Sequence, residues 1–117
     1  MGAPVVHFEV IGKNPLKLQK FFSEVFDWKI NTDNPIGYGL VEPQKENSIG
    51  GGIGPAGQSK GYATFYIEVD DLEATLQKIE KNKGQIVVPV TTIPGMVTYA
   101  MFADPEGHLI GLVKSEK

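Results

Sequence analysis

The stretch YATFYIEVDDLEATLQKI, at residues 62–79, repeats the pattern of VVHFEVIGKNPLKLQKFF, at residues 5–22. A constant offset of 57 residues relates the two copies, since Phe8 matches Phe65 and Ile30 matches Val87. Self-similarity at a fixed spacing indicates one supersecondary unit that is used twice. The repeat therefore predicts two modules with a common fold and directs the search for a site to the place where they meet.

Each copy is expected to form a strand, a helix and three further strands, because short apolar runs alternate with Gly- and Pro-rich turns. The first module, residues 1–57, has predicted strands at 5–11, 28–31, 38–42 and 48–53. The second module, residues 58–117, has predicted strands at 62–69, 86–92, 97–103 and 109–114. The 117 residues are enough for a single domain with a modest core.

The two predicted helices have clear boundary signals. Asn14 before Pro15 predicts the start of the first helix, and Asp70-Asp71 predicts the start of the second. The second helix is expected to continue to about Lys83, where Gly84 ends it. Four apolar side chains recur at helical spacing in the first helix, so we expect them in the core: Phe21, Phe22, Val25 and Phe26.

The composition excludes several classes of function. A net charge of −3, with Lys and Glu interleaved, argues against the basic patch that nucleic acids and anionic membranes require. The chain has no cysteine, which excludes disulfides and thiolate metal sites. No leader pattern and no long apolar run are present, so we expect a cytoplasmic protein that does not enter the membrane.

The first strand of each copy carries polar groups on one face. Side chains alternate along a strand, so His7 and Glu9 share a face, and Thr64, Tyr66 and Glu68 share the matching face of the second copy. Burial of a histidine and a glutamate without partners would cost several kcal/mol, roughly 2–7 per polar group. We therefore expect a ligand or further polar groups on this face.

The motifs VVHFEV, NPLKLQKFFSEVFDWKI, FYIEVDDLEATLQKI and FADPEGHLIGLV resemble those of the vicinal oxygen chelate superfamily. That superfamily includes glyoxalase I, bleomycin-resistance proteins and extradiol dioxygenases. The resemblance implies an α+β fold in which two tandem βαβββ modules form an incomplete barrel. It also implies a homodimer, because members of the superfamily commonly associate in pairs.

In the metal-using members, the first and last strands of each module supply the ligands of a divalent ion. The resemblance places these positions at His7, Gly50, Thr64 and Gly111, so one of the four is a family-type ligand. A divalent ion needs about three protein groups, and glycine has no side chain to offer. We therefore predict no resident metal or other cofactor, the alternative being a divalent ion at a site rebuilt with Glu9 or Glu68.

The leading hypothesis is a metal-free protein that binds a small apolar or aromatic molecule in the concave sheet. Its predicted ligand-binding residues are His7, Glu9, Trp28, Gly50, Thr64, Tyr66 and Gly111. The glycine run at 50–54 is expected to make room for the ligand. An enzyme is the second hypothesis, either a metal-dependent lyase, isomerase or dioxygenase, or a metal-free enzyme with His7 as base and Glu9 as its partner. A third is a non-catalytic, dimeric interaction module.

Overall fold

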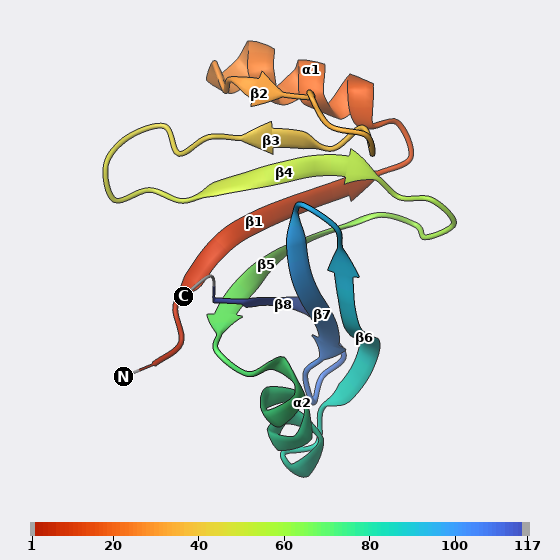
Figure 1. The fold of residues 1–117 in the computed structure, drawn as a ribbon. Coiled ribbons are helices and arrows are strands. Elements are labelled where there is room, and N and C mark those ends of the chain that lie inside the picture. The colour runs from red at the N-terminus through yellow and green to blue at the C-terminus, as the bar shows by residue number, and fades with distance from the viewer. Residues whose placement is uncertain (1, 116–117) are drawn as a thin grey trace. The chain divides into compact units, whose positions relative to one another are not determined.

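The computed structural model describes residues 2–115, and Figure 1 traces the chain. These residues form two compact units. One unit is His7–Thr64, and the other combines the described residues up to Val6 with those from Phe65 onward. The module boundary predicted between residues 57 and 58 falls in the connection between the fourth and fifth strands, inside the first of these units.

The unit His7–Thr64 contains most of β1 (Val5–Gly12), followed by α1 (Pro15–Phe26), β2 (Ile30–Asn31), β3 (Gly39–Val41) and β4 (Gly50–Pro55). Its strands lie in the order β2-β3-β4-β1. The β1 and β4 strands are parallel, whereas β3 is antiparallel to both β2 and β4. The second strand is shorter than predicted because α1 ends at Asp27, whose left-handed φ of 59° turns the chain.

The other unit contains most of β5 (Tyr62–Val69), followed by α2 (Leu72–Lys81), β6 (Gln85–Ile93), β7 (Val97–Ala103) and β8 (Leu109–Lys114). Its strands lie in the order β5-β8-β7-β6, with β5 and β8 parallel and the remaining pairs antiparallel. Figure 1 shows α2 at the end of this sheet where β6 begins.

The two units have the same topology, and their first strands and helices begin 57 residues apart, as the sequence repeat does. The strand β1 at 5–12 becomes β5 at 62–69 when it is shifted by 57 residues, and the first residue of α1, Pro15, becomes that of α2, Leu72. In both units the first strand lies parallel to the last. The prediction of an α+β chain built from two βαβββ modules is confirmed.

Both helices begin as predicted. The side chain of Asn14 accepts a hydrogen bond from the Lys17 N–H at 3.1 Å, and that of Asp71 accepts one from the Ala74 N–H at 3.0 Å. The second helix ends at Lys81, two residues before the predicted end. Lys83, with a φ of 76°, turns the chain there, and the Gly84 N–H returns to the Ile79 carbonyl at 2.9 Å.

The prediction that the apolar stripe of α1 lies in the core is wrong for three of its four residues. Phe21, Val25 and Phe26 are each more than half exposed, at 55%, 56% and 54%. The helix instead buries Gln19, whose amide donates to the Ile53 carbonyl at 2.9 Å. A helix on a sheet buries only the narrow face that is turned toward it, and this stripe is wider than that face.

The core of the second unit is better developed. Leu72 and Leu76 of α2 pack with Ala100, Phe102 and Leu112 of β7 and β8 in one buried cluster. Between those strands, the predicted tight turn is closed by the Gly107 N–H, which donates to the Asp104 carbonyl at 2.8 Å. His108 is exposed, as predicted, and its Nδ1 lies 2.9 Å from the Asp104 carboxylate.

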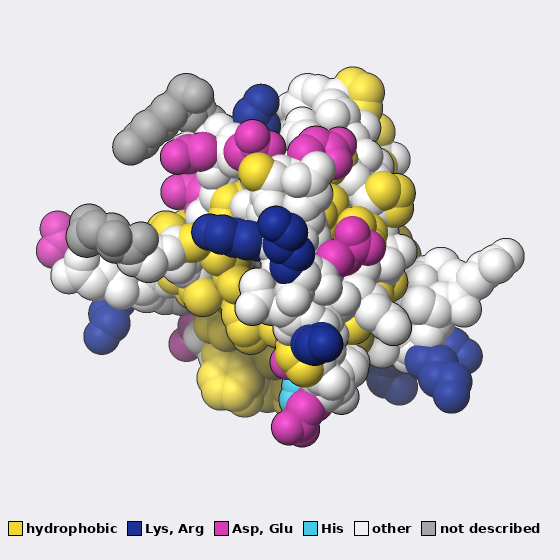
Figure 2. Space-filling model, turned by 90° about the horizontal axis from the view of Figure 1, so that it is seen from below, with side chains coloured by type: hydrophobic (Ala, Val, Ile, Leu, Met, Phe, Trp, Pro, Cys, Tyr) yellow, Lys and Arg dark blue, Asp and Glu magenta, His cyan; other side chains and the backbone are white. Residues whose placement is uncertain are grey.

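Within the described residues, no helix is both long and apolar enough to span a membrane. On the face shown in Figure 2, lysines and acidic side chains are interspersed, and no large area of one sign is visible.

Candidate functional site

A hydrogen-bonded group of three side chains lies on the polar face of β1. The Tyr38 hydroxyl donates to Glu9 Oε2 at 2.8 Å, and His7 Nε2 lies 2.9 Å from the same hydroxyl oxygen. The imidazole and phenol rings are nearly parallel, with an interplanar angle of 16°. We call His7, Tyr38 and Glu9 the polar triad, because the tyrosine joins the imidazole to the carboxylate.

The loop before β3 holds Tyr38 in place through its backbone. The Asn34 side chain accepts from the Tyr38 N–H at 3.1 Å and donates to the Tyr38 carbonyl at 2.6 Å. The phenol ring lies across two glycines of β4, since a Cβ built on Gly52 would come within 1.9 Å of the ring and one built on Gly54 within 2.7 Å. The side-chain-free strand therefore sets the position of the tyrosine.

Burial decides the charge state of the imidazole. Glu9 is only 8% exposed, and His7 is half-buried. Desolvation lowers the pKa of His7 below its ordinary value of 6.5, because burial penalises the charged form. The imidazole is consequently neutral at neutral pH.

The direction of the tyrosine proton determines the tautomer of His7. A phenol has one O–H, and Tyr38 directs it to Glu9. The His7 Nε2 must then be the donor in its 2.9 Å contact with the Tyr38 oxygen. In the neutral ring the lone pair then lies on Nδ1.

A second tyrosine approaches the same carboxylate. The Tyr62 hydroxyl lies 3.5 Å from Glu9 Oε1, at the long limit for a hydrogen bond. Tyr62 starts β5 and belongs to the same unit as the polar triad.

The register of the sheet revises one of the predicted equivalences. In the first unit Gly50 pairs with His7 and Gly52 pairs with Glu9. In the second unit Gly111 pairs with Tyr66, which is the residue that the 57-residue offset matches to Glu9. The counterpart of Gly111 is therefore Gly52, two residues beyond the predicted Gly50.

The glycines do not leave the open space that the sequence analysis expected. A Cβ on Gly50 would lie 2.6 Å from the Val41 carbonyl oxygen, so backbone already occupies that position. A Cβ on Gly111 would lie 2.4 Å from the ring of Tyr66, a buried residue. Gly52 in the first module and Gly111 in the second thus each make room for a tyrosine ring of the protein itself.

Trp28 lies apart from the polar triad. Its ring stacks on Phe22 with a centroid distance of 5.1 Å and an interplanar angle of 9°, and it also contacts Phe8 at 5.2 Å. Since side chains alternate along β1, Phe8 faces away from His7 and Glu9. Trp28 therefore lies in an aromatic group with Phe22 and Phe8, on the other face of β1 from His7 and Glu9.

The remaining predicted positions lie along β5. Thr64 is half-buried in the first unit, whereas Tyr66 is buried in the second and its hydroxyl lies 4.0 Å from the sulfur of Met101. Glu68 is half-buried, and its backbone N–H donates to the Pro4 carbonyl.

A divalent ion would need about three ligating side chains close together. Among residues 2–115, no three His, Asp or Glu side chains lie close enough together to hold a metal. In the first unit His7 and Glu9 are the available donors, and the Tyr38 hydroxyl already joins them. Two donors are fewer than the three that a catalytic ion usually requires.

Tyr38 is not among the seven predicted ligand-binding residues, although it is one of several aromatic residues near the predicted strands that could line a pocket. A signal for it exists in the glycines at alternate positions 50, 52 and 54, which leave one face of a strand bare. A bare face needs an occupant, but the sequence does not show which aromatic side chain supplies it.

The model of the Glyoxalase/Bleomycin resistance protein/Dioxygenase superfamily matches residues 5–112. The chain is 31% identical over 100 residues to a "Glyoxylase-like domain-containing protein" of Didymella fabae, and the match covers 76% of each protein. It is 26% identical over 107 residues to "Putative glyoxylase CFP32" of Mycobacterium tuberculosis. That match covers 85% of this chain but only 41% of the mycobacterial protein.

Solved structures support the same fold. A glyoxalase/bleomycin resistance protein/dioxygenase superfamily member from Vibrio splendidus aligns with a TM-score of 0.64 at 16% identity, over 97% of this chain and all of that one. The methylmalonyl-CoA epimerase of Streptomyces coelicolor aligns with a TM-score of 0.66 at 12% identity, over 97% of this chain and 95% of that one. With the family model matching almost the whole sequence and the paired βαβββ topology observed, the chain belongs to the glyoxalase/bleomycin resistance protein/dioxygenase superfamily.

Proposed function

We propose that this chain binds a small molecule at the polar triad without a resident metal. One observation carries the proposal: the second module reaches the same βαβββ topology with Thr64 and Tyr66 where the first has His7 and Glu9. The fold therefore does not require the buried carboxylate or its imidazole partner. Burial of such groups has a free-energy cost, and a cost that the fold does not require supports a functional role.

The chemistry of the triad suggests the kind of ligand. The triad combines an imidazole whose pKa is lowered by burial with a buried carboxyl group that accepts a hydrogen bond from Tyr38. A ligand with an N–H or O–H donor and an aromatic or apolar body suits this arrangement, because Tyr38 also presents its ring. Sequestration of such a compound would be one form of this function.

A ligand screen with matched variants tests the proposal. We expect members of a library of small aromatic hydrogen-bond donors to raise the melting temperature of the wild-type chain, and His7→Gln and Glu9→Gln to abolish that rise. Tyr99→Phe removes a hydroxyl in the other unit and should leave binding intact. If no compound stabilises the wild type, or if protein purified without chelators contains a stoichiometric divalent metal, the proposal is wrong.

A second candidate function is metal-free acid–base catalysis with His7 as the base. The hydrogen bonds from His7 to Tyr38 and from Tyr38 to Glu9 favour it, since they join an imidazole to a carboxyl group that could orient it as a base. Exchange of a ligand C–H proton with deuterated solvent would test this reading. The exchange should disappear in His7→Gln while ligand binding is measured separately.

The predicted homodimer and cytoplasmic location also belong to this proposal. Exposed Phe21, Val25 and Phe26 on α1 are compatible with a second copy on that face. Light scattering across a range of protein concentrations tests the dimer, and a constant monomer mass would contradict it.

A further inference from the structure

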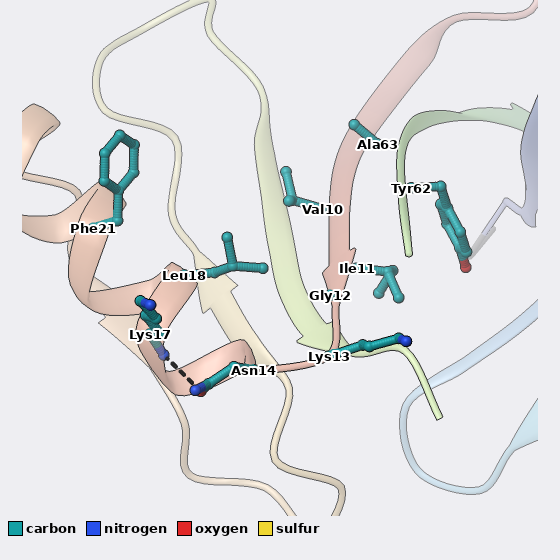
Figure 3. Close-up of a pocket in the computed structure, with 10 residues that line it drawn as sticks. All are labelled: Val10, Ile11, Gly12, Lys13, Asn14, Lys17, Leu18, Phe21, Tyr62 and Ala63. Carbon is teal, nitrogen blue, oxygen red and sulfur yellow. Dashed lines mark hydrogen bonds between the residues drawn. The ribbon is translucent and has the colours of Figure 1, made fainter. Parts of the chain in front are cut away.

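An open apolar cavity of about 510 Å³ lies between α1 and β1, entirely within the unit His7–Thr64. Val10, Leu18, Phe21 and Ala63 contribute apolar walls, and Figure 3 shows Val10 and Leu18 directed into the space between the helix and the strand. Its volume lies within the range of about 300–1,000 Å³ that small-molecule sites occupy.

Two lysines are among the residues that line this cavity. Lys13 and Lys17 are the two charged residues that line it, both are exposed, and no acidic side chain is among its lining residues. In Figure 3 the two lysines lie on either side of Asn14, where the chain enters α1. An apolar wall with ammonium groups at the rim matches a molecule with an apolar tail and one negative head.

The second module shows that the fold does not require this arrangement. The 57-residue offset matches Lys13 to Asp70 and Phe21 to Lys78. In that module Leu72 and Leu76 of α2 close the space against the sheet, as members of its buried cluster. Lys13 and Phe21, which line the cavity, are therefore not repeated in the second module.

We propose that the cavity binds a free, medium-chain carboxylate, with the chain along Val10, Leu18 and Phe21 and the carboxylate at Lys13 and Lys17. His7, Tyr38 and Glu9 do not line this cavity, whereas Tyr62, whose hydroxyl lies 3.5 Å from Glu9, does. Its ligand is a dissolved carboxylate that enters tail first.

Isothermal titration with sodium octanoate and 1-octanol separates the two parts of the site. We expect the wild type to bind one octanoate per chain about fivefold more tightly than octanol, because each exposed charge contributes modestly. The variant K13Q/K17Q should lose that preference to within about twofold. The control K20Q/K29Q removes the same charge from outside the cavity and should keep it.

A second variant tests the apolar part. Ala63 is exposed and lines the cavity, so Ala63→Phe should fill the space and weaken both ligands at least about tenfold without unfolding the protein. His7→Gln should leave octanoate binding unchanged, which separates this test from that of the polar triad.

Three results would overturn the proposal. The first is the absence of saturable octanoate binding to the wild type. The second is an equal loss of preference in K20Q/K29Q and K13Q/K17Q. The third is amide-exchange protection of residues 10–18 that depends on protein concentration and not on octanoate, which would assign the cavity to a second copy of the chain.

Discussion

The Tyr38 hydroxyl is expected to stabilise the first unit measurably. Tyr38→Phe keeps the ring that covers Gly52 and Gly54 but removes the bonds at 2.8 Å to Glu9 and 2.9 Å to His7. Removal of one partner that leaves a buried polar group unsatisfied costs about 1–3 kcal/mol. Because Glu9 is 8% exposed, water cannot fully replace the lost donor. We expect the free energy of unfolding to fall by about 2 kcal/mol.

Urea unfolding at pH 7, followed by the fluorescence of Trp28, measures this change. The transition midpoint should move to lower urea with an unchanged slope. Tyr99→Phe is the matched control, since no hydrogen bond of its hydroxyl occurs within residues 2–115, and it should change stability by less than about 0.5 kcal/mol. Equal effects of the two variants would refute the assignment of Tyr38 as the link between His7 and Glu9.

Three further predictions follow from burial and close contact. Because the pKa of His7 is lowered in the folded state, the free energy of unfolding of the wild type should fall as the pH drops below 6.5, by at most about 1.4 kcal/mol per pH unit. Urea titrations at a series of pH values measure this fall, and His7→Gln should remove the part of it that His7 causes. Gly52→Ala places a methyl group 1.9 Å from Tyr38, so the ring must move. We expect the free energy of unfolding to fall by at least about 1 kcal/mol, and the variant should also lose ligand binding at the polar triad. Val25→Ala should change stability by less than about 0.5 kcal/mol, whereas Phe22→Ala, which removes a ring stacked on Trp28, should cost about 2 kcal/mol or more; thermal unfolding that ranks them in the opposite order would contradict the observed packing of α1.

The first helix shows how far a periodic pattern can be interpreted. Helical spacing correctly predicted α1 from Pro15 to Phe26, but it did not predict which part of the apolar stripe meets the sheet. Phe21 and Val25 are exposed while Gln19 is buried. Periodicity describes the helix itself, whereas burial depends on the neighbour, and here the Ile53 carbonyl offers Gln19 a partner.

The candidate site was also predictable only in part, because a pattern within one strand does not show which neighbouring residues contact it. Alternation along β1 placed His7 and Glu9 on one face, and the structure joins them through Tyr38. Trp28 was expected beside them because it is aromatic and close to a strand. It lies instead with Phe22, since the chain turns at the end of α1 before it enters β2.

The sequence by itself determined the duplicated βαβββ topology, because strand alternation, helix caps and the 57-residue offset are local or periodic properties of the chain. The resemblance to the superfamily, and not this offset, placed glycines at the last-strand ligand positions. Only the tertiary structure decided what occupies the space above those glycines. Tyr66 lies over Gly111 because the parallel register of β5 and β8 pairs these two residues, which are 45 positions apart in the chain. Tyr38 lies over Gly52 because it directly precedes β3, whose antiparallel register with β4 pairs Gly39 with Ile53.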